Sequence, residues 1–277
     1  MIHLDLIGIG TGHPDHLTRA AEAAMRAADL ILLPRKEDKA ELIDLRRDIC
    51  VQVLAGAATR VVEFDLPVRA GEGDYLDNVE RWHDAIAQCW AAEIARALPQ
   101  GGRVALLVWG DPSLYDSTIR IARRLIAVER VTVVPGITSL QLLCAAHAIP
   151  FNAVAAPVMV TTGRRLREGG WPEGADSVAV MLDGGCAFTT LDQPDAVIWW
   201  GAYLGMAQQA VEAGRLADIA ERIVTRRAEL RRAHGWIMDV YLLRRGGDLV
   251  GEGFAPSGVA CGIAPTPNPS PLPGGGA

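Results

Sequence analysis

The sequence predicts an α/β protein whose first half forms a parallel sheet. Short apolar runs alternate with stretches of helical periodicity, the run at 103–109 is almost continuously apolar, and Gly- or Pro-rich turns follow several of the runs. Because helices cover both faces of a parallel sheet, its strands are typically apolar throughout. We therefore expect strands and helices to alternate along this half.

The elements of the first half follow from hydrophobic periodicity and from Gly and Pro positions. The strands are expected at 2–9, 30–33, 103–109 and 131–134, and the helices at 17–28, 75–98 and 117–127. Pro99-Gln100-Gly101-Gly102 ends the longest of these helices, because both residue types disfavour its continuation.

The second half predicts a second α/β domain. Its strands are expected at 154–161, 177–182, 196–200 and 236–243, and its longest helix at 206–229. The density of motifs changes near Ile137, so we expect domains at 1–136 and 137–250. The segment 251–277 is rich in proline and glycine, which predicts a disordered tail because little burial can offset its ordering entropy.

Composition narrows the classes of function. Half of the 277 residues are apolar, enough for a sizeable core, and the net charge of -6 comes without a strongly basic segment, which argues against a nucleic-acid partner. The five cysteines are scattered, and neither a signal-peptide pattern nor a membrane-length apolar run is present. We expect a cytoplasmic protein that acts on a small molecule, with no membrane partner.

The first candidate turn is Gly8-Ile9-Gly10-Thr11-Gly12-His13, between a strand and a helix. It matches a dinucleotide fingerprint only in part, because His13 takes the place of the third glycine. The next strand ends in Leu33-Pro34-Arg35-Lys36, without the acidic residue that would hold the ribose of NAD. The basic pair suits the phosphate of NADP or carboxylates of a substrate, and the less favoured alternative is a helix-initiating turn without a ligand.

The second candidate turn, Trp109-Gly110-Asp111-Pro112-Ser113-Leu114-Tyr115, follows a buried strand. Open α/β sheets bind ligands at this carboxyl edge. Its backbone groups could hold an amino-acid moiety, and Asp111 could either meet an ammonium group or cap the following helix.

The third candidate turn, Pro135-Gly136-Ile137-Thr138-Ser139, repeats this arrangement one strand later. Thr138 or Ser139 is placed to cap a helix, with a hydroxyl that could also reach a ligand. Two such turns at successive strand ends predict a crevice, and without a phosphate-binding lysine-serine signature a nucleoside triphosphate is disfavoured.

Other patterns carry little functional signal. The histidines have no metal-ligand spacing, so no metal is expected, and no serine lies in a G-x-S-x-G elbow. The basic cluster Arg226-Arg227 and Arg231-Arg232 is expected to be a solvated helix face without a role.

Together, in this order, the three turns resemble the signature of the tetrapyrrole methylase family. The third turn precedes a helix that ends at Ala148-Ile149-Pro150, and the resemblance extends from Met1 to about Arg245. Within the family, three segments resemble members that act late in aerobic cobalamin biosynthesis; they are 6–18, 200–205 and 235–244.

The resemblance implies a homodimer of two-domain subunits, with S-adenosylmethionine bound in the cleft between the two α/β domains. The residues that it implies for cofactor binding are Trp109, Gly110, Asp111, Leu114, Thr138, Ser139, Met181, Leu182, Gly201 and Ala202. Gly10, Thr11 and Gly12 of the first loop are expected to face the substrate instead.

The implied reaction is methylation of precorrin-5 at C-1, with water removing an acetyl group as acetate, to give precorrin-6A and S-adenosylhomocysteine. His13 and Asp15 are the candidates for activating that water. Arg35, Lys36 and Lys39 are expected to pair with peripheral carboxylates of the substrate.

The sequence departs from the general family pattern in two places. Thr11 replaces the usual proline and His13 the usual acidic residue of the first loop, and Pro34-Arg35-Lys36 stands where related uroporphyrinogen methylases have an aspartate assigned to proton removal. That base is therefore not carried over. The alternatives are another precorrin methyltransferase of the same fold, an NADP-linked oxidoreductase, and a non-catalytic carrier of a tetrapyrrole.

Overall fold

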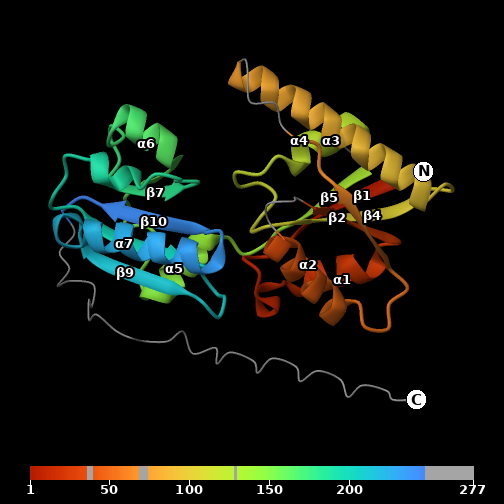
Figure 1. The fold of residues 1–277 in the computed structure, drawn as a ribbon, viewed down its shortest axis with the longest axis horizontal. Helices are drawn as coiled ribbons and strands as arrows, with labels where there is room; N and C mark the ends of the chain where they lie inside the picture. The colour runs from red at the N-terminus through yellow and green to blue at the C-terminus, as the bar shows by residue number, and fades with distance from the viewer. Residues whose placement is uncertain (36–39, 69–73, 128–129, 247–277) are drawn as a thin grey trace.

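The computed structural model describes residues 1–35, 40–68, 74–127 and 130–246 and contains two five-stranded sheets, each with its own helices (Figure 1). The expected tail at 251–277 lies outside these residues. Among them, no helix is both long and apolar enough to cross a membrane.

The first sheet is parallel throughout, as the sequence predicts, with strand order β3-β2-β4-β1-β5. Its strands are β1 (Ile2–Gly8), β2 (Leu30–Arg35), β3 (Arg60–Asp65), β4 (Gly102–Val108) and β5 (Val131–Val134). Strand β1 lies between β4 and β5 in the sheet. The carboxyl ends of these three strands are therefore neighbours, which brings the three candidate turns together at one edge of the sheet.

Helices cover both faces of this sheet, as Figure 1 shows. They are α1 (Arg19–Ala27), α2 (Ala40–Val53), α3 (Tyr75–Ala97) and α4 (Thr118–Leu125). Alternate residues of one strand point to opposite faces, so Ile7 packs in the core beneath α1 and α2 while Leu6 packs in the core beneath α3 and α4. Helix α2 and strand β3 were not expected from the sequence.

The second sheet is mixed, with order β6-β7-β10-β8-β9; β6 is parallel to β7, and the other pairs are antiparallel. Its strands are β6 (Val158–Thr162), β7 (Ser177–Met181), β8 (Val197–Ala202), β9 (Ala210–Arg215) and β10 (Asp239–Arg244). Its helices are α5 (Ser139–His147), α6 (Gly163–Gly169) and α7 (Leu216–His234).

The prediction of a helix at 206–229 is wrong for its first ten residues. Ala210–Arg215 forms β9, which pairs antiparallel with β8, and the helix begins only at Leu216. Cross-strand pairing overrides the helical pattern, since this stretch has a partner strand that its own sequence does not reveal.

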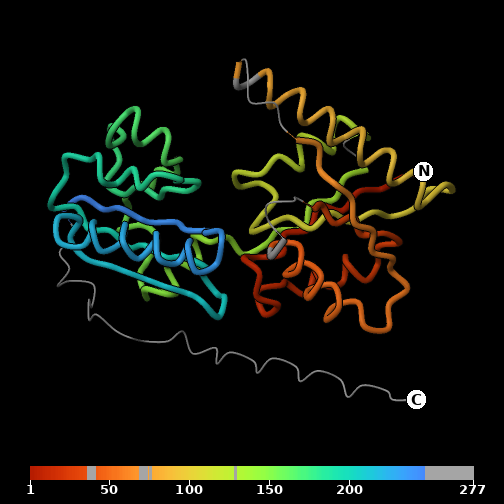
Figure 2. Tube along the Cα trace, in the orientation of Figure 1, coloured from red at the N-terminus to blue at the C-terminus, as the bar shows by residue number. Residues whose placement is uncertain are grey.

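The chain crosses once from the first sheet to the second in the stretch after β5, as the tube in Figure 2 shows. Helix α5 follows at once, and its Leu140 and Leu143 pack against Val197 and Trp199 of the second sheet. The division at 136/137 stays a proposal, which this packing supports.

Candidate active site

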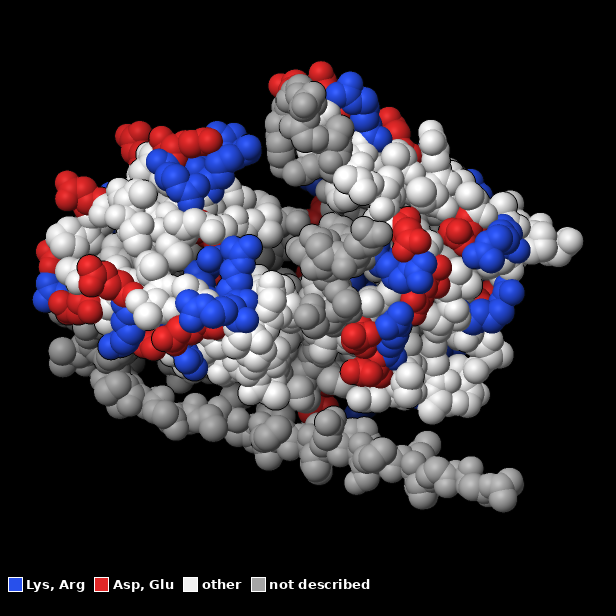
Figure 3. Space-filling view, in the orientation of Figure 1, with Lys and Arg blue, Asp and Glu red and all other residues white. Residues whose placement is uncertain are grey.

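A cavity of about 580 Å³ lies between the two domains and is lined by residues of both. Ten of the residues expected to bind cofactor or substrate line it: Gly10, Thr11, Trp109, Gly110, Asp111, Leu114, Thr138, Ser139, Met181 and Leu182. Ligand sites commonly have this size and position. Figure 3 shows basic side chains of the second domain on the edge that faces the first.

Backbones of the three turns approach one another closely at the first-domain wall. A Cβ atom on Gly136 would lie 2.1 Å from the carbonyl oxygen of Gly110, and one on Gly8 would lie 2.6 Å from the Gly136 nitrogen. The Gly110 N–H also donates to the Gly10 carbonyl at 2.6 Å. Gly8 and Gly136 are needed because their strand ends meet without room for side chains, and Gly110 is favoured by its φ of +63°.

Asp111 ties the second turn to the third. One carboxylate oxygen accepts from the Ser113 N–H at 2.8 Å and from the Ser113 hydroxyl, and the other accepts from the Gly136 N–H at 2.9 Å. Burial alone would raise the pKa of Asp111, but these hydrogen bonds hold it below the ordinary value. Asp111 is therefore ionised and connects the second turn to the third, and its side chain also lines the cavity.

Of the two residues expected to cap a helix here, Thr138 is the one that caps α5. Its hydroxyl accepts from the Leu140 N–H at 3.2 Å, and the Gln141 side chain accepts from the Thr138 N–H at 3.0 Å, which forms a capping box. Helix α5 thus begins at the cavity wall, where its first residue, Ser139, lines the cavity.

Thr11 joins the first loop to the second domain. Its hydroxyl donates to the Leu204 carbonyl at 2.6 Å. Nearby, Gly205 has φ +80°, and a Cβ there would lie 2.0 Å from Cε1 of His16. Proline has no hydroxyl, so this contact between domains depends on the departure from the usual proline of the family pattern.

His13 and Asp15 do not line the cavity. The Asp15 N–H donates to His13 Nδ1 at 3.2 Å, and the Asp15 side chain is 57% exposed. His13 caps a short 3-10 helix over Pro14–His16, and Asp15 lies within that helix. Their assignment to water activation stays a prediction.

Four more of the expected substrate and cofactor residues also lie off the cavity. Arg35 makes a two-point ion pair with Asp65 at 2.9 and 3.0 Å, and Gly12 packs against Met206 and Trp109. Gly201 and Ala202 lie in β8, and the two residues that follow, Tyr203 and Leu204, line the cavity instead. Lys36 and Lys39 lie outside the described residues.

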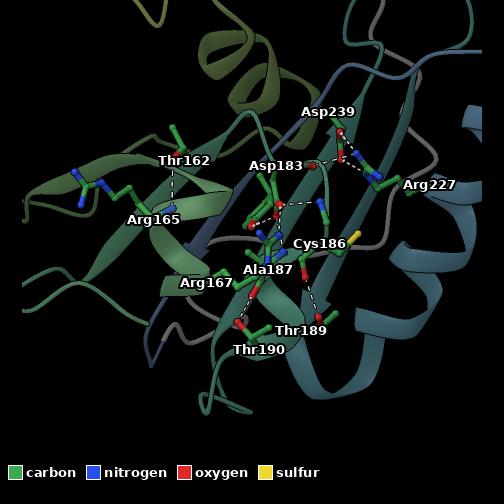
Figure 4. A network of polar contacts seen from close by, with 12 residues as sticks. Thr162, Arg165, Arg167, Asp183, Cys186, Ala187, Thr189, Thr190, Arg227 and Asp239 are labelled. Carbon is green, nitrogen blue, oxygen red and sulfur yellow. Dashed lines mark hydrogen bonds and ion pairs between the residues drawn. The ribbon is translucent and has the colours of Figure 1, made fainter. Parts of the chain in front are cut away.

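An ionic network that was not expected from the sequence forms part of the second-domain wall (Figure 4). Arg227 donates to both carboxylate oxygens of Asp239 at 2.8 and 3.2 Å and to the Asp183 carbonyl at 3.0 Å. Burial alone would lower the pKa of Arg227, but the hydrogen bonds and charge of Asp239 raise it overall. Both members of the pair are largely buried.

The expectation that the basic cluster of α7 is a solvated face is wrong for Arg227, which is largely buried, whereas Arg226, Arg231 and Arg232 are exposed as expected. Arg227 and Arg231 both line the cavity. They are four residues apart and so share one side of α7. That spacing was the available signal, but only the packing of α7 shows that this side meets the cavity.

Asp183, also missed, organises the loop that follows β7. Its carboxylate accepts from the Ala187 N–H at 2.6 Å, the Tyr241 hydroxyl at 2.7 Å and Arg167 at 3.2 Å. Burial and the charge of Asp183 raise the pKa of Tyr241, which keeps that hydroxyl protonated as a donor. A Cβ on Gly163 would lie 2.2 Å from the Asp183 side chain, so glycine makes the necessary room.

Strained backbone concentrates at the cavity. Of the six described non-glycine residues with positive φ, three line it: Tyr115 at 50°, Leu182 at 53° and Tyr203 at 49°. Such conformations persist only where the surroundings hold them. Leu182, 67% exposed, thereby presents an apolar side chain to the cavity. Among the described residues, no group of histidine, cysteine or acidic side chains could hold a metal.

The fold and site define a two-domain α/β protein with a ligand cavity between its domains. The family model described as Tetrapyrrole (Corrin/Porphyrin) Methylases matches residues 3–220. A precorrin-6A synthase [deacetylating] from a Sinorhizobium species is 49% identical over 88% of this chain and 95% of its own length. The chain belongs to the tetrapyrrole methylase family.

Solved structures share the fold. A putative cobalamin synthesis related protein (CobF) from Corynebacterium diphtheriae has a TM-score of 0.75 and 37% identity, covering 88% of this chain and 99% of that one. A uroporphyrin-III C-methyl transferase from Thermus thermophilus, complexed with S-adenyl homocysteine, has a TM-score of 0.53 and 20% identity, covering 87% and 97%. The latter is similar in fold alone.

Proposed function

We propose that this protein is an S-adenosylmethionine-dependent C-methyltransferase that methylates precorrin-5 at C-1 with loss of acetate, giving precorrin-6A in cobalamin biosynthesis. The observation that carries the proposal is the interdomain cavity, in a chain 49% identical to a relative named for that product and for deacetylation. Family membership favours methyl transfer over the NADP-linked oxidoreductase and the passive carrier.

The cavity residues fit S-adenosylmethionine. Backbone groups of the Asp111 and Thr138 turns suit its amino-acid part, Leu114 and Leu182 offer apolar surface, and the site carries carboxylates that favour a cation. When bound, the cofactor supplies an electrophilic methyl group on a positively charged sulfur. These residues would hold it in the cavity.

The chain's main task in methyl transfer is to position the reactants. The three turns are fixed by close glycine contacts, by Asp111 and by the α5 capping box, and the second-domain wall is fixed by Arg227 and Asp239. Rigid walls favour in-line approach of the substrate carbon to the methyl group, and orientation of this kind supplies much of the lowering of the barrier.

Acetate release requires water as a second reactant. Water adds to the acetyl carbonyl, the bond from that carbon to the macrocycle breaks, and the macrocycle keeps the electron pair and takes a proton. His13 and Asp15 are proposed to assist the addition, supported by their place in the first loop beside the cavity residues Gly10 and Thr11.

A single-turnover reaction of the purified protein with precorrin-5 and S-adenosylmethionine tests the proposal. The expected product carries one more methyl group and lacks the acetyl group, with one equivalent of acetate released. Methyl gain without acetate would indicate a precorrin methyltransferase of different specificity. Absence of methyl gain would contradict the proposal.

A homodimer in the cytoplasm is proposed on the strength of the family resemblance. Light scattering coupled to size-exclusion chromatography checks the first point, with an expected mass of twice the 29.6 kDa of one chain. Fractionation of the source cells checks the second.

A further inference from the structure

A second cavity, of about 320 Å³, lies within the first domain. It is enclosed by the carboxyl ends of β2 and β4 and by helices α2, α3 and α4. Leu42, Trp109 and Asp116 line both this cavity and the larger one, so the two adjoin. We call the smaller cavity the side chamber. Its position at the carboxyl edge of a parallel sheet is one where ligands bind.

Three buried N–H groups belong to side chains that line the side chamber. Arg46 Nε, Trp90 Nε1 and Trp109 Nε1 have no hydrogen-bond partner among the described residues. Buried donors are nearly always satisfied in folded proteins, because each unmet donor is costly. Three of them around one cavity indicate a ligand that supplies acceptors.

Arg46 provides charge as well as donors. Its guanidinium carbon lies 4.6 Å from the centre of the Trp109 ring, which forms the boundary with the main cavity. Burial lowers its pKa to about 10, and the charge of Asp116 partly opposes that effect. The side chain therefore stays cationic at neutral pH. An arginine in this state favours a planar anion with two acceptor oxygens.

The adjacent Arg47 shows what an arginine without such a site does. It points outward and pairs with Glu63 at 2.6 Å and with Asp44 at 2.5 Å. Both residues are arginines on α2, so the helix, the charge and the side-chain size are the same. The difference is that the partners of Arg47 are in the chain, whereas Arg46 is directed into a cavity.

We propose that the side chamber binds one peripheral carboxylate side chain of the tetrapyrrole substrate, with Arg46 and the indole N–H groups of Trp90 and Trp109 as donors. Its apolar walls, which include Phe64 and Ile86, suit the methylene stem of an acetate or propionate group. Its volume suits a side chain better than a macrocycle, which stays in the larger cavity. This assignment rests on the proposed function for the identity of the substrate.

The variant Arg46→Met tests the assignment, with Arg47→Met as the matched control. The expected result for Arg46→Met is a rise of about tenfold or more in KM for precorrin-5, with kcat and the Kd of S-adenosylhomocysteine little changed. Arg46→Lys keeps the positive charge but lacks the planar guanidinium group, so its KM for precorrin-5 is expected to lie between those of the wild type and Arg46→Met. Arg47→Met should leave KM unchanged.

Thermal stability separates binding from a structural role. Arg46→Met removes a desolvated charge, so its Tm should equal or exceed that of the wild type. An unchanged KM overturns the assignment. A matching loss of affinity for S-adenosylhomocysteine would place Arg46 at the cofactor and also overturn it. A Tm lowered beyond that of Arg47→Met would show a structural role instead.

A second probe keeps this test separate from the reaction itself. Uroporphyrin III and its octamethyl ester differ only in their carboxylates, and tryptophan fluorescence reports binding because Trp82, Trp90 and Trp109 line the chamber. This probe supports the assignment of the chamber even if precorrin-5 is not the substrate. The expected result is that the wild type binds the acid but not the ester, and that Arg46→Met no longer binds the acid. Equal binding of acid and ester, or binding of neither, overturns it.

Discussion

The two domains build their walls of the main cavity in different ways. The first-domain wall rests on close backbone packing, because a Cβ on Gly8 or Gly136 would collide with the backbone of a neighbouring turn. The second-domain wall is mainly side chain, with Arg227 and Asp239 from separate elements joined in a largely buried ion pair. A wall of backbone depends on local turns, whereas a wall of side chains depends on how α7 and β10 are packed.

This difference has energetic consequences. Replacing a glycine in the first wall forces backbone apart, while removing one ion-pair partner in the second leaves a buried charge without compensation. The first change disturbs the geometry of strand ends. The second disturbs electrostatics inside a packed core.

The largest expected effect is from Arg227→Met, which leaves Asp239 buried without its cationic partner. We expect unfolding free energy to fall by about 3 kcal/mol or more, as measured by urea denaturation. The matched control is Arg222→Met on the same helix, whose pair with Glu212 is more exposed, with side chains 57% and 23% accessible. That control should lose less than about 1 kcal/mol. Equal losses would contradict the contrast between the two pairs.

Gly136→Ala is expected to cost about 1–3 kcal/mol and to weaken binding of S-adenosylhomocysteine, because its Cβ would collide with the Gly110 carbonyl. Denaturation and calorimetric titration measure the two effects. Gly184→Ala, in the second-domain wall, is the control, since a Cβ there meets nothing within 4 Å. A stable Gly136→Ala protein with normal affinity would show that the strand ends can separate freely.

Asp111→Asn is expected to cost about 1–2 kcal/mol, because the carboxylate loses charge-assisted hydrogen bonds from Ser113 and Gly136. Binding of S-adenosylhomocysteine should weaken together with stability.

Asp15→Asn, off the cavity and exposed, should leave binding of S-adenosylhomocysteine unchanged and slow acetate release. An Asp15→Asn protein with full acetate release would remove Asp15 from the mechanism.

The smallest effect is a dependence of stability on pH. Burial lowers the pKa of His16 in the first domain and of His147 in the second, each from an ordinary value near 6.5. The unfolded chain therefore takes up protons that the folded protein resists, so stability is complete above that pH and is lost as pH falls below it. Urea midpoints at pH 7.5 and 5.5 measure the loss. His147→Gln should reduce this slope, and an unchanged slope would exclude its contribution.

The sequence was most informative where structure is local. The three turns, the parallel first sheet and the helix cap at Thr138 could be predicted, because Gly, Pro and capping residues act through their own backbone and near neighbours. The prediction of a helix across 206–229 failed because β9 owes its form to pairing with β8.

By itself the sequence determined the fold class and the turns at the strand ends, since apolar periodicity and turn chemistry encode these directly, and the resemblance of those turns indicated the family. Tertiary structure alone decided that Arg227 meets Asp239, that Thr11 reaches Leu204, and that Arg46 faces a chamber while Arg47 faces solvent. Each of these depends on residues brought together by the packing of distant elements. Side chains of one type, even neighbours in sequence, have different surroundings once the chain is folded.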